Sequence, residues 1–543
     1  MGSDGLINGH DRGPQLLSAP QAENEDSRSW IVQKFGGTSL GKFAINVAED
    51  IVKYVKLARL QDVITDQSCL PNRPSLADHR IAVVCSARSS HTKAEGTTNR
   101  LLRAARAAEK PNSNQHQAIV DAICDDHISA VNHHIGSPEI VANVTADIRR
   151  ECADLSAFLE ATQRVGEISP RSEDKVISKG EKLSCLFVAA LLQDREVESE
   201  YVDLSEIVTF DVQHGLDLQF YHKLASSLAR LIFSRGNKVP VITGKKRPAP
   251  VYDGMVPKCL SGYFGSVPGG ILDKVGRGYT DLCAALVAVG LHAEELQVWK
   301  EVDGIFTADP RKVPTARLLP TITPAEAAEL TFYGSEVIHP FTMEQVIQAR
   351  IPIRIKNVMN PRGNGTVILP DKLSELDTGR RGLDLSLTRT RSSSILSEHR
   401  PKRPTAVTIK RQILVINVHS NKRSLSHGFF AKIFSTLHKW RLSVDLISTS
   451  EVHVSMALHS ESAFLSGWGD DALELLDKDL GGAIMELQDY GTVDIIPNMA
   501  ILSLVGRQMR NMIGIAGRMF STLGENNVNI EMISQGKRSL DAF

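Results

Sequence analysis

A lysine stands directly before a glycine-rich turn near the start of the chain, a combination suited to handling phosphate. Lys34 lies near the end of the short apolar run 31–35, and the turn that follows is built from Gly36, Gly37, Thr38 and Ser39. Glycines let the backbone approach a phosphate closely, and free N–H groups at a helix start favour anions. Because the lysine precedes the glycines, this is not the P-loop motif. The same residues would also serve a purely structural turn.

A second glycine-rich loop carries an arginine and an aspartate just before an apolar helical pattern. Arg277 lies between Gly276 and Gly278, and Thr280 and Asp281 follow. A guanidinium can form a bidentate pair with a carboxylate, so this loop suits an anionic substrate. The alternative is a tight loop in which Thr280 or Asp281 caps the helix.

A third candidate segment, residues 300–311, follows a strand-like run and is rich in turn residues. It contains the cations Lys300 and Arg311 as well as Phe306 and Asp309. In α/β sheets, ligands bind beyond the carboxyl ends of the strands, and this position favours a function for the segment. Its composition is nevertheless that of an ordinary turn.

Two smaller signals accompany these three segments. Glu181 lies at an expected helix start, where it could pair with a substrate ammonium or simply complement the helix dipole. Thr98 belongs to the short motif Gly96–Asn99, which also precedes a helical pattern.

The first folded unit is expected over residues 30–361, after a disordered tail at 1–29. Its continuous apolar runs are typical of parallel strands buried on both faces. These runs are 31–35, 80–85, 201–202, 239–243, 296–299 and 351–355. Helical patterns alternate with them, so the sequence predicts an α/β fold with a mostly parallel sheet flanked by helices.

A basic, serine-rich stretch at 362–405 is expected to be a linker. After it the pattern restarts, with strands predicted at 407–409, 413–419 and 528–533. Two segments in the remainder share Phe-Ser-Thr-Leu, a polar turn and a strand ending near Ile-Ser, which indicates a repeated βαβ unit. The expected boundaries of the two units are 406–495 and 496–543. Modules of this type bind small effectors at their edges.

Composition excludes several classes of protein. The chain has 543 residues, with 62 Lys and Arg against 63 Asp and Glu, so no global positive field exists to bind nucleic acid or an anionic membrane. No apolar run is long enough to span a bilayer. Seven cysteines without a CxxC motif argue against a disulfide framework and a structural zinc site. We therefore expect a cytoplasmic protein without a protein-bound metal centre.

Together these segments resemble aspartate kinase, a member of the amino acid kinase family, in its fungal, monofunctional form. The similarity runs from about residue 30 to 536. The matching motifs are KFGGTS (34–39), SKGEKLS (178–184), GRGYTD (276–281), KEVDGIFTADPR (300–311), YGSEVIHP (333–340), SNKRSLSHGFFA (420–431) and VDLISTSEV (444–452).

The resemblance implies a reaction and a regulator. The γ-phosphoryl group of ATP, with Mg²⁺ bridging its phosphates, would pass to the β-carboxylate of L-aspartate and give 4-phospho-L-aspartate. This is the first step toward threonine, methionine and isoleucine, and threonine is the expected inhibitor. The implied fold is an amino acid kinase domain followed by two ACT domains, the second truncated, and ACT pairing implies a homo-oligomer.

The resemblance also implies residue roles. Lys34 would neutralise charge on the transferred group, and Asp281 would orient Lys34. The aspartate site would comprise Thr38, Ser39, Thr98, Glu181 and Arg277. The ATP site would comprise Lys34, Gly36, Gly37, Lys300, Phe306, Asp309 and Arg311. The effector site would comprise Ser426, Gly428 and Asp445.

One departure from the family pattern concerns a second phosphate-binding cation. Some bacterial relatives carry a lysine where this chain has Glu336, so Lys300 or Arg311 would have to replace it. Two alternatives to the assignment stay open at this point. One is a kinase of another amino-acid carboxylate, and the other is an inactive threonine-sensing protein.

Two segments do not fit the family pattern. Residues 245–262 interrupt the expected continuation from Gly244 to Tyr263, and residues 537–543 replace the expected end of the last module. Each break falls at a Gly-Lys pair whose codons can contain a splice donor. The sequence therefore suggests retained introns, with a genuine surface loop as the alternative for the first segment. The second ACT module would then lack its last β-α-β portion.

Overall fold

The computed structural model of this chain describes most of the three expected folded units. The predicted tail 1–29 is described only at Ser29, and the predicted linker 362–405 only at its two ends. The segment 245–262, which interrupts the first unit, lies outside the described residues. The described residues are 29–54, 79–89, 95–111, 113–204, 207, 217–234, 238–243, 279–332, 338, 340–369, 403–420, 428–440, 442–450, 452–459, 478–507, 509, 512–535 and 539–542.

The first unit is built on a mostly parallel sheet with the strand order β3-β4-β2-β1-β5-β7-β8-β6. Among the described strands of this sheet, only the pair β7 and β8 is antiparallel. The strands are β1 (Ser29–Phe35), β2 (His79–Cys85), β3 (Ser199–Asp203), β4 (Val239–Thr243), β5 (Glu295–Lys300), β6 (Thr321–Ile322), β7 (Ile353–Asn357) and β8 (Thr366–Ile368). The predicted α/β class is confirmed, and the central position of β1 places its carboxyl end between those of β2 and β5.

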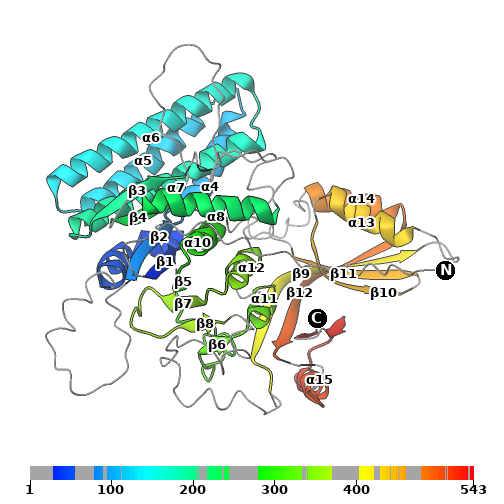
Figure 1. The fold of residues 1–543 in the computed structure, drawn as a ribbon. Helices are drawn as coiled ribbons and strands as arrows, with labels where there is room; N and C mark the ends of the chain where they lie inside the picture. Colours follow the sequence, from blue (N-terminus) through cyan, green and yellow to red (C-terminus); the bar gives the residue numbers. More distant parts are fainter. Residues whose placement is uncertain are drawn as a thin grey trace, which may run out of the picture.

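Helices cover both faces of this sheet and bury two separate cores (Figure 1). Because side chains alternate along a strand, Val32 and Val298 face one core while Phe35 and Trp299 face the other. The helices are α1 (Gly37–Lys42), α2 (Ala44–Asn46), the π-helix η1 (Val47–Lys53), α4 (Thr97–Ala108), α5 (Gln115–His134), α6 (Pro138–Val165), α7 (Pro170–Asp194), α8 (Leu218–Phe233), α10 (Tyr279–Gly290), α11 (Pro324–Phe332) and α12 (Pro340–Gln348).

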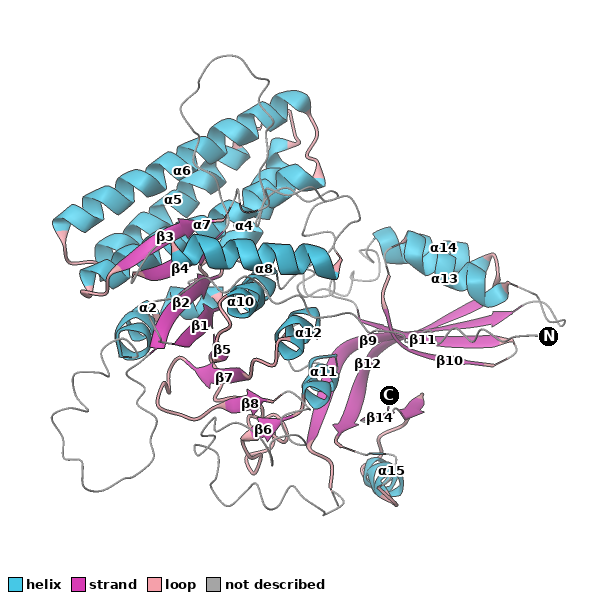
Figure 2. Cartoon of the chain, viewed as in Figure 1, coloured by secondary structure: helices cyan, strands magenta, loops and turns pink. Residues whose placement is uncertain are grey.

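The second unit is a six-stranded sheet with the order β10-β11-β9-β12-β14-β13. Its elements are β9 (Ala406–Ser420), α13 (Phe429–Lys439), β10 (Val444–Thr449), β11 (His453–His459), α14 (Lys478–Gln488), β12 (Gly491–Val505), α15 (Ile515–Glu525), β13 (Ile533–Gln535) and β14 (Ser539–Ala542). From β9 to β12 they follow the βαββαβ order of an ACT module. Helices α13 and α14 lie together on one face of the sheet, and α15 lies apart from them (Figure 2).

Three predicted strands differ from those observed. Residues 407–409 and 413–419 form one strand, β9, because β12 pairs with it along nearly its whole length. The predicted strand at 528–533 begins only at Ile533. The last module was expected to lack its final β-α-β portion, but Ser539–Ala542 adds β14 between β12 and β13. The two edge strands of this sheet, among the described residues, are therefore β10 and β13.

Candidate active site

Lys34 and Asp281, the two predicted catalytic residues, form an ion pair in the structure. Lys34 lies one residue before the end of β1, and Asp281 lies in the first turn of α10. Their Nζ and Oδ1 atoms are 2.7 Å apart, and the side chains are only 12% and 21% exposed. Low exposure limits screening by water, so the lysine is held in one position at the carboxyl edge of the sheet.

The glycine turn after Lys34 packs directly against the loop that follows β2. The carbonyl oxygen of Gly37 accepts a hydrogen bond of 2.9 Å from the backbone N–H of Ser89. A Cβ atom on Gly37 would lie 2.0 Å from the carbonyl oxygen of Ala87, which only glycine avoids. Of the two hydroxyl residues predicted here, Thr38 is half-buried and Ser39 is buried.

Glu181, predicted to bind a substrate ammonium, was expected at a helix start, but it lies in the middle of α7, which already begins at Pro170. From there it reaches α10. Its Oε1 accepts a hydrogen bond of 2.5 Å from the hydroxyl of Thr280, next to Asp281. Burial raises the pKa of Glu181 to about 7, although hydrogen bonds from Thr280 and Tyr279 and the charge of Lys34 act in the opposite direction. The structure thus brings Lys34, Asp281 and Glu181 into one electrostatic cluster.

The sequence pattern pointed to Thr98 but not to its buried neighbour Thr97. Thr97 opens α4, and its Oγ1 donates a hydrogen bond of 2.7 Å to the carbonyl oxygen of Arg88. Gly180, one residue before Glu181, packs so tightly here that a Cβ would lie 3.0 Å from a methyl carbon of Thr97. Thr98 itself is half-buried. A tandem threonine at a helix start was the signal that could have drawn attention to Thr97.

The predicted nucleotide residues lie at the neighbouring strand end. Lys300 is the last residue of β5, directly after Trp299, whose ring stacks on Phe35 with centroids 6.1 Å apart. Lys34 pairs in register with Val298, so Lys300, two residues farther, projects to the same face of the sheet as Lys34. This shared face distinguishes Lys300 from the other candidate cation.

Asp309 and Arg311 contact each other rather than the lysine cluster. The guanidinium of Arg311 binds both carboxylate oxygens of Asp309 at 3.1 and 3.2 Å, and the arginine side chain is 88% exposed. Its hydrogen bonds to Asp309 raise the pKa of Arg311. Phe306 is half-buried and pairs with Leu318 through an isolated bridge.

The remaining predicted site residues fall into two groups. Arg277, Ser426 and Glu336 lie outside the described residues, as does the segment 245–262. Gly428 is described and precedes α13 with a φ of 90°. Asp445 lies on β10, where its carboxylate pairs with Lys410 at 2.6 Å.

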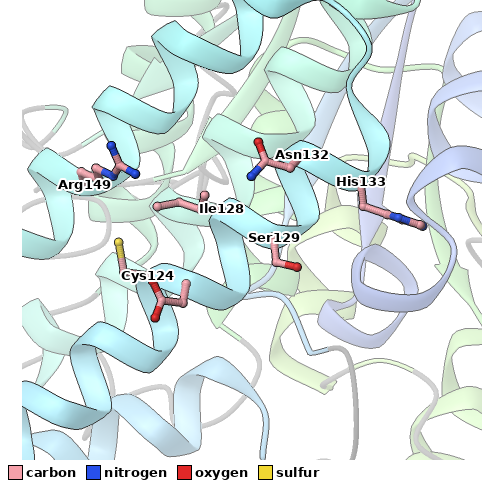
Figure 3. Close-up of a pocket in the computed structure, with 7 residues that line it drawn as sticks. Cys124, Ile128, Ser129, Asn132, His133 and Arg149 are labelled. Atoms are coloured by element: carbon pink, nitrogen blue, oxygen red, sulfur yellow. The ribbon is translucent and has the colours of Figure 1, made fainter.

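A separate hollow of about 550 Å³ lies on the outer helices α5 and α6 (Figure 3). Figure 3 shows Ser129 and His133 on one helix and Arg149 on the other. None of the residues that line it belongs to the predicted site. In the described part of the chain, no three His, Cys, Asp or Glu side chains are grouped to hold a metal ion. Among the same residues, no helix is both long and apolar enough to cross a membrane.

Comparison with known protein families agrees with the two-part architecture described above. Residues 29–357 match the amino acid kinase family, and residues 502–540 match an ACT domain family. The first match spans more than half of the chain, and the chain therefore belongs to the amino acid kinase family.

Curated relatives narrow the class to the aspartate kinases. The chain is 49% identical to aspartokinase from Schizosaccharomyces pombe over 524 residues, which cover 96% of this chain and 91% of that protein. It is also 49% identical to aspartokinase from Saccharomyces cerevisiae over 515 residues, covering 94% and 89% of the two chains. The predicted enzyme class, an aspartate kinase, is confirmed.

A solved structure supports the same fold over nearly the full length. The crystal structure of Escherichia coli aspartokinase III in complex with aspartate and ADP superposes with a TM-score of 0.64 at 25% identity, covering 94% of this chain and 95% of that one. A complex of the same enzyme with lysine and aspartate gives a TM-score of 0.65. The predicted combination of an amino acid kinase fold with ACT-type sequence is therefore confirmed.

Proposed function

We propose that this chain transfers the γ-phosphoryl group of ATP to the side-chain carboxylate of L-aspartate, with Lys34 at the reaction centre. A β-carboxylate oxygen forms a bond to Pγ while the bond from Pγ to the bridging oxygen of ADP breaks. The products are 4-phospho-L-aspartate and ADP. The observation that carries this proposal is the ion pair between Lys34 and Asp281, which fixes a cation at the carboxyl edge of the sheet.

Lys34 stabilises the charge that spreads over the transferred group during the reaction. Phosphoryl transfer needs positioned positive charge more than covalent help from the protein. Asp281 keeps the ammonium from swinging away when no phosphate is present. The turn at Gly36 and Gly37 brings backbone N–H groups close to the phosphates, and Lys300 supplies the second cation because it shares a face with Lys34.

Glu181 binds the α-ammonium of aspartate. A buried carboxylate with a raised pKa gains most from an incoming cation, since pairing repays the cost of desolvation. Thr98, Thr38 and Ser39 contribute hydroxyl groups to the acceptor site, and Arg277 clamps the α-carboxylate. Among these residues, the selectivity for an amino acid rests on Glu181.

ATP would enter as its Mg²⁺ complex, and the metal would neutralise part of the charge on the phosphates. Enzymes that use Mg²⁺ in this way hold it with few carboxylates and rely on the substrate phosphates. The chain is cytoplasmic and assembles as a homo-oligomer through its ACT modules. Threonine is the proposed inhibitor, with Ser426, Gly428 and Asp445 in its pocket.

The direct test is acceptor-dependent release of ADP by the purified full chain. Aspartate, glutamate and N-acetylglutamate are compared as acceptors, each with and without threonine. We expect turnover with aspartate and inhibition by threonine. Turnover with glutamate or N-acetylglutamate but not with aspartate would overturn the substrate assignment, and turnover insensitive to threonine would overturn only the effector.

A further inference from the structure

Arg88 is a buried arginine that the sequence patterns did not single out. It lies three residues after β2, in the loop at the carboxyl edge of the sheet, and is 7% exposed. Burying a guanidinium is costly unless it is paired and hydrogen-bonded. We therefore ask which contacts of this buried arginine offset the cost of burial and what they do for the candidate active site.

The backbone of Arg88 joins the two helices that carry predicted acceptor-site residues. Its N–H donates a hydrogen bond of 2.7 Å to Oγ of Ser184, which in turn donates to the carbonyl oxygen of Gly180 at 2.9 Å. Its carbonyl oxygen accepts hydrogen bonds from Thr97, at 2.7 Å from Oγ1 and 3.3 Å from the backbone nitrogen. One residue thus links α7, which carries Glu181, to the start of α4.

The residues on either side of Arg88 fix the glycine turn. Ala87 places its carbonyl oxygen against Gly37, and Ser89 donates its N–H to the carbonyl oxygen of Gly37 at 2.9 Å. The loop 86–89 therefore contacts three walls of the proposed acceptor site at once: the glycine turn, the start of α4 and the middle of α7. A shift of this loop would move all three relative to one another.

The side chain of Arg88 anchors the loop to α5. Its Nη1 lies 3.3 Å from the backbone carbonyl oxygen of Asp126 and 3.6 Å from Oδ2 of the same residue. Arg100 on α4 donates to that Oδ2 from 3.2 Å. The guanidinium also lies 5.9 Å from the ring centroid of Phe187 on α7. One carboxylate thus fixes two arginines, one from the loop and one from α4.

We infer that Arg88, held by Asp126, is a positioning residue for the amino-acid acceptor: it sets the loop 86–89, and through it Thr97, Thr98 and the glycine turn, at the spacing that the acceptor requires. This inference rests on the proposed function and adds a residue that need not touch the substrate. Lysine is not equivalent to arginine here. Nη1 of Arg88 makes both contacts with Asp126, and the rest of the planar guanidinium lies 5.9 Å from the ring centroid of Phe187, a position that a compact, strongly hydrated ammonium does not reproduce.

The test compares Arg88→Lys with the matched control Arg100→Met in the full chain. The control removes the other partner of Asp126 and leaves the loop contacts in place. We expect Arg88→Lys to raise the KM for aspartate by roughly 10-fold to 100-fold, the range in which a misplacement of about 1 Å acts. The KM for ATP should change by less than about 2-fold, and Arg100→Met should change neither by more than that.

Amide hydrogen exchange provides a readout that does not depend on the acceptor. The backbone amides of Thr97 and Ser89 should exchange faster in Arg88→Lys than in Arg100→Met, since both amides bond to the loop or its partner. Equal exchange in the two variants, or an equal rise in both KM values, would overturn the inference. If the unmodified chain phosphorylates no aspartate, the proposed function fails, and the exchange rates still decide whether Arg88 sets the loop.

Discussion

The hydroxyl of Thr405 donates a hydrogen bond of 2.6 Å to Oε1 of Glu326, joining the start of the second sheet to helix α11 of the first unit. Glu326 is 2% exposed, and its other oxygen accepts from the backbone and side chain of Thr323, as in a helix capping box. The guanidinium of Arg507, just after β12, lies 3.4 Å from the same oxygen. A local helix cap therefore also holds the two units together.

The contacts of Glu326 with Thr405 and Arg507 are called the joint below. Thr405→Val should weaken this joint without disturbing the helix cap. Losing one hydrogen bond to a buried carboxylate costs about 1–3 kcal/mol. Val407 donates its N–H to the carbonyl oxygen of Thr307 in the predicted nucleotide segment, so exchange of the Val407 amide should become faster. Thr323→Val is the control, because it damages the cap and leaves the bond from Thr405. Faster Val407 exchange in the control but not in Thr405→Val would contradict the assignment.

The pH dependence of the joint follows from Glu326. Burial acts to raise the pKa of Glu326, but hydrogen bonds from Thr405 and Thr323 and the charge of Arg507 hold it below its ordinary value. A lowered folded-state pKa means that the stabilisation is present above the unfolded pKa and is lost as the pH falls through the folded value. Glu326→Gln should therefore flatten the acid side of the stability profile, measured by urea unfolding between pH 3 and pH 6. An unchanged acid slope would contradict this.

Lys34→Met should abolish most of the activity. Removing a charge that stabilises the transferred group costs on the order of 10²–10³ in kcat. The substitution also leaves the partly buried Asp281 without its lysine partner, which alone destabilises the fold. The double variant Lys34→Met with Asp281→Asn removes that cost and should regain stability but not turnover. Near-normal kcat in either variant would show that Lys34 is not at the reaction centre.

The sequence predicted the residues proposed to contact the substrates better than the residues that position them. Lys34 could be found because it precedes a glycine turn, and Asp281 because it follows a glycine-rich loop. Glu181 was found through an expected helix start, although it lies in the middle of α7, and the structure brings all three residues together. Arg88 and Asp126 could not be found, because their pairing depends on how α5 packs against the loop after β2. Local composition carries no information on such a long-range contact.

The same limit applies to the boundaries of strands and to the joint. β9 reads as two short strands, since the polar residues at 410–412 interrupt its apolar pattern, but pairing with β12 joins the two parts into one strand. Thr323 and Glu326 match a capping box in the sequence, and nothing local reveals that the free oxygen reaches Thr405. Contacts between segments far apart in the sequence determine both the length of β9 and the hydrogen bond between Thr405 and Glu326.

The two glycines of the turn should differ sharply in their tolerance of alanine. A Cβ on Gly37 would lie 2.0 Å from a backbone oxygen. A Cβ on Gly36 would have no described heavy atom within 4 Å other than those of its chain neighbours, and Gly36 has a φ of −73°. We expect Gly37→Ala to lower the free energy of unfolding by about 1–3 kcal/mol, the usual cost of overpacking. Gly36→Ala should change it by less than about 1 kcal/mol. Equal effects in urea unfolding would contradict the observed packing of the turn.

Binding of the acceptor should strengthen as the pH rises through about 7. Burial raises the pKa of Glu181 to that value, with Thr280, Tyr279, Lys34 and Asp281 as its neighbours. Only the ionised carboxylate attracts the ammonium of aspartate, so KM should fall between pH 6 and pH 8. Glu181→Gln should show a high KM that lacks this dependence.

Stability should follow the opposite trend at the same residue. The folded chain retains the Glu181 proton up to about pH 7, whereas the unfolded chain releases it near the ordinary value of 4.5. The stabilisation that this proton gives is complete below the unfolded pKa and is lost as the pH rises through the folded pKa. Glu181→Gln should therefore remove part of the decline in unfolding free energy between about pH 4.5 and 7. A KM that is flat in the unmodified chain, together with an unchanged stability profile in the variant, would show that Glu181 does not titrate in this range.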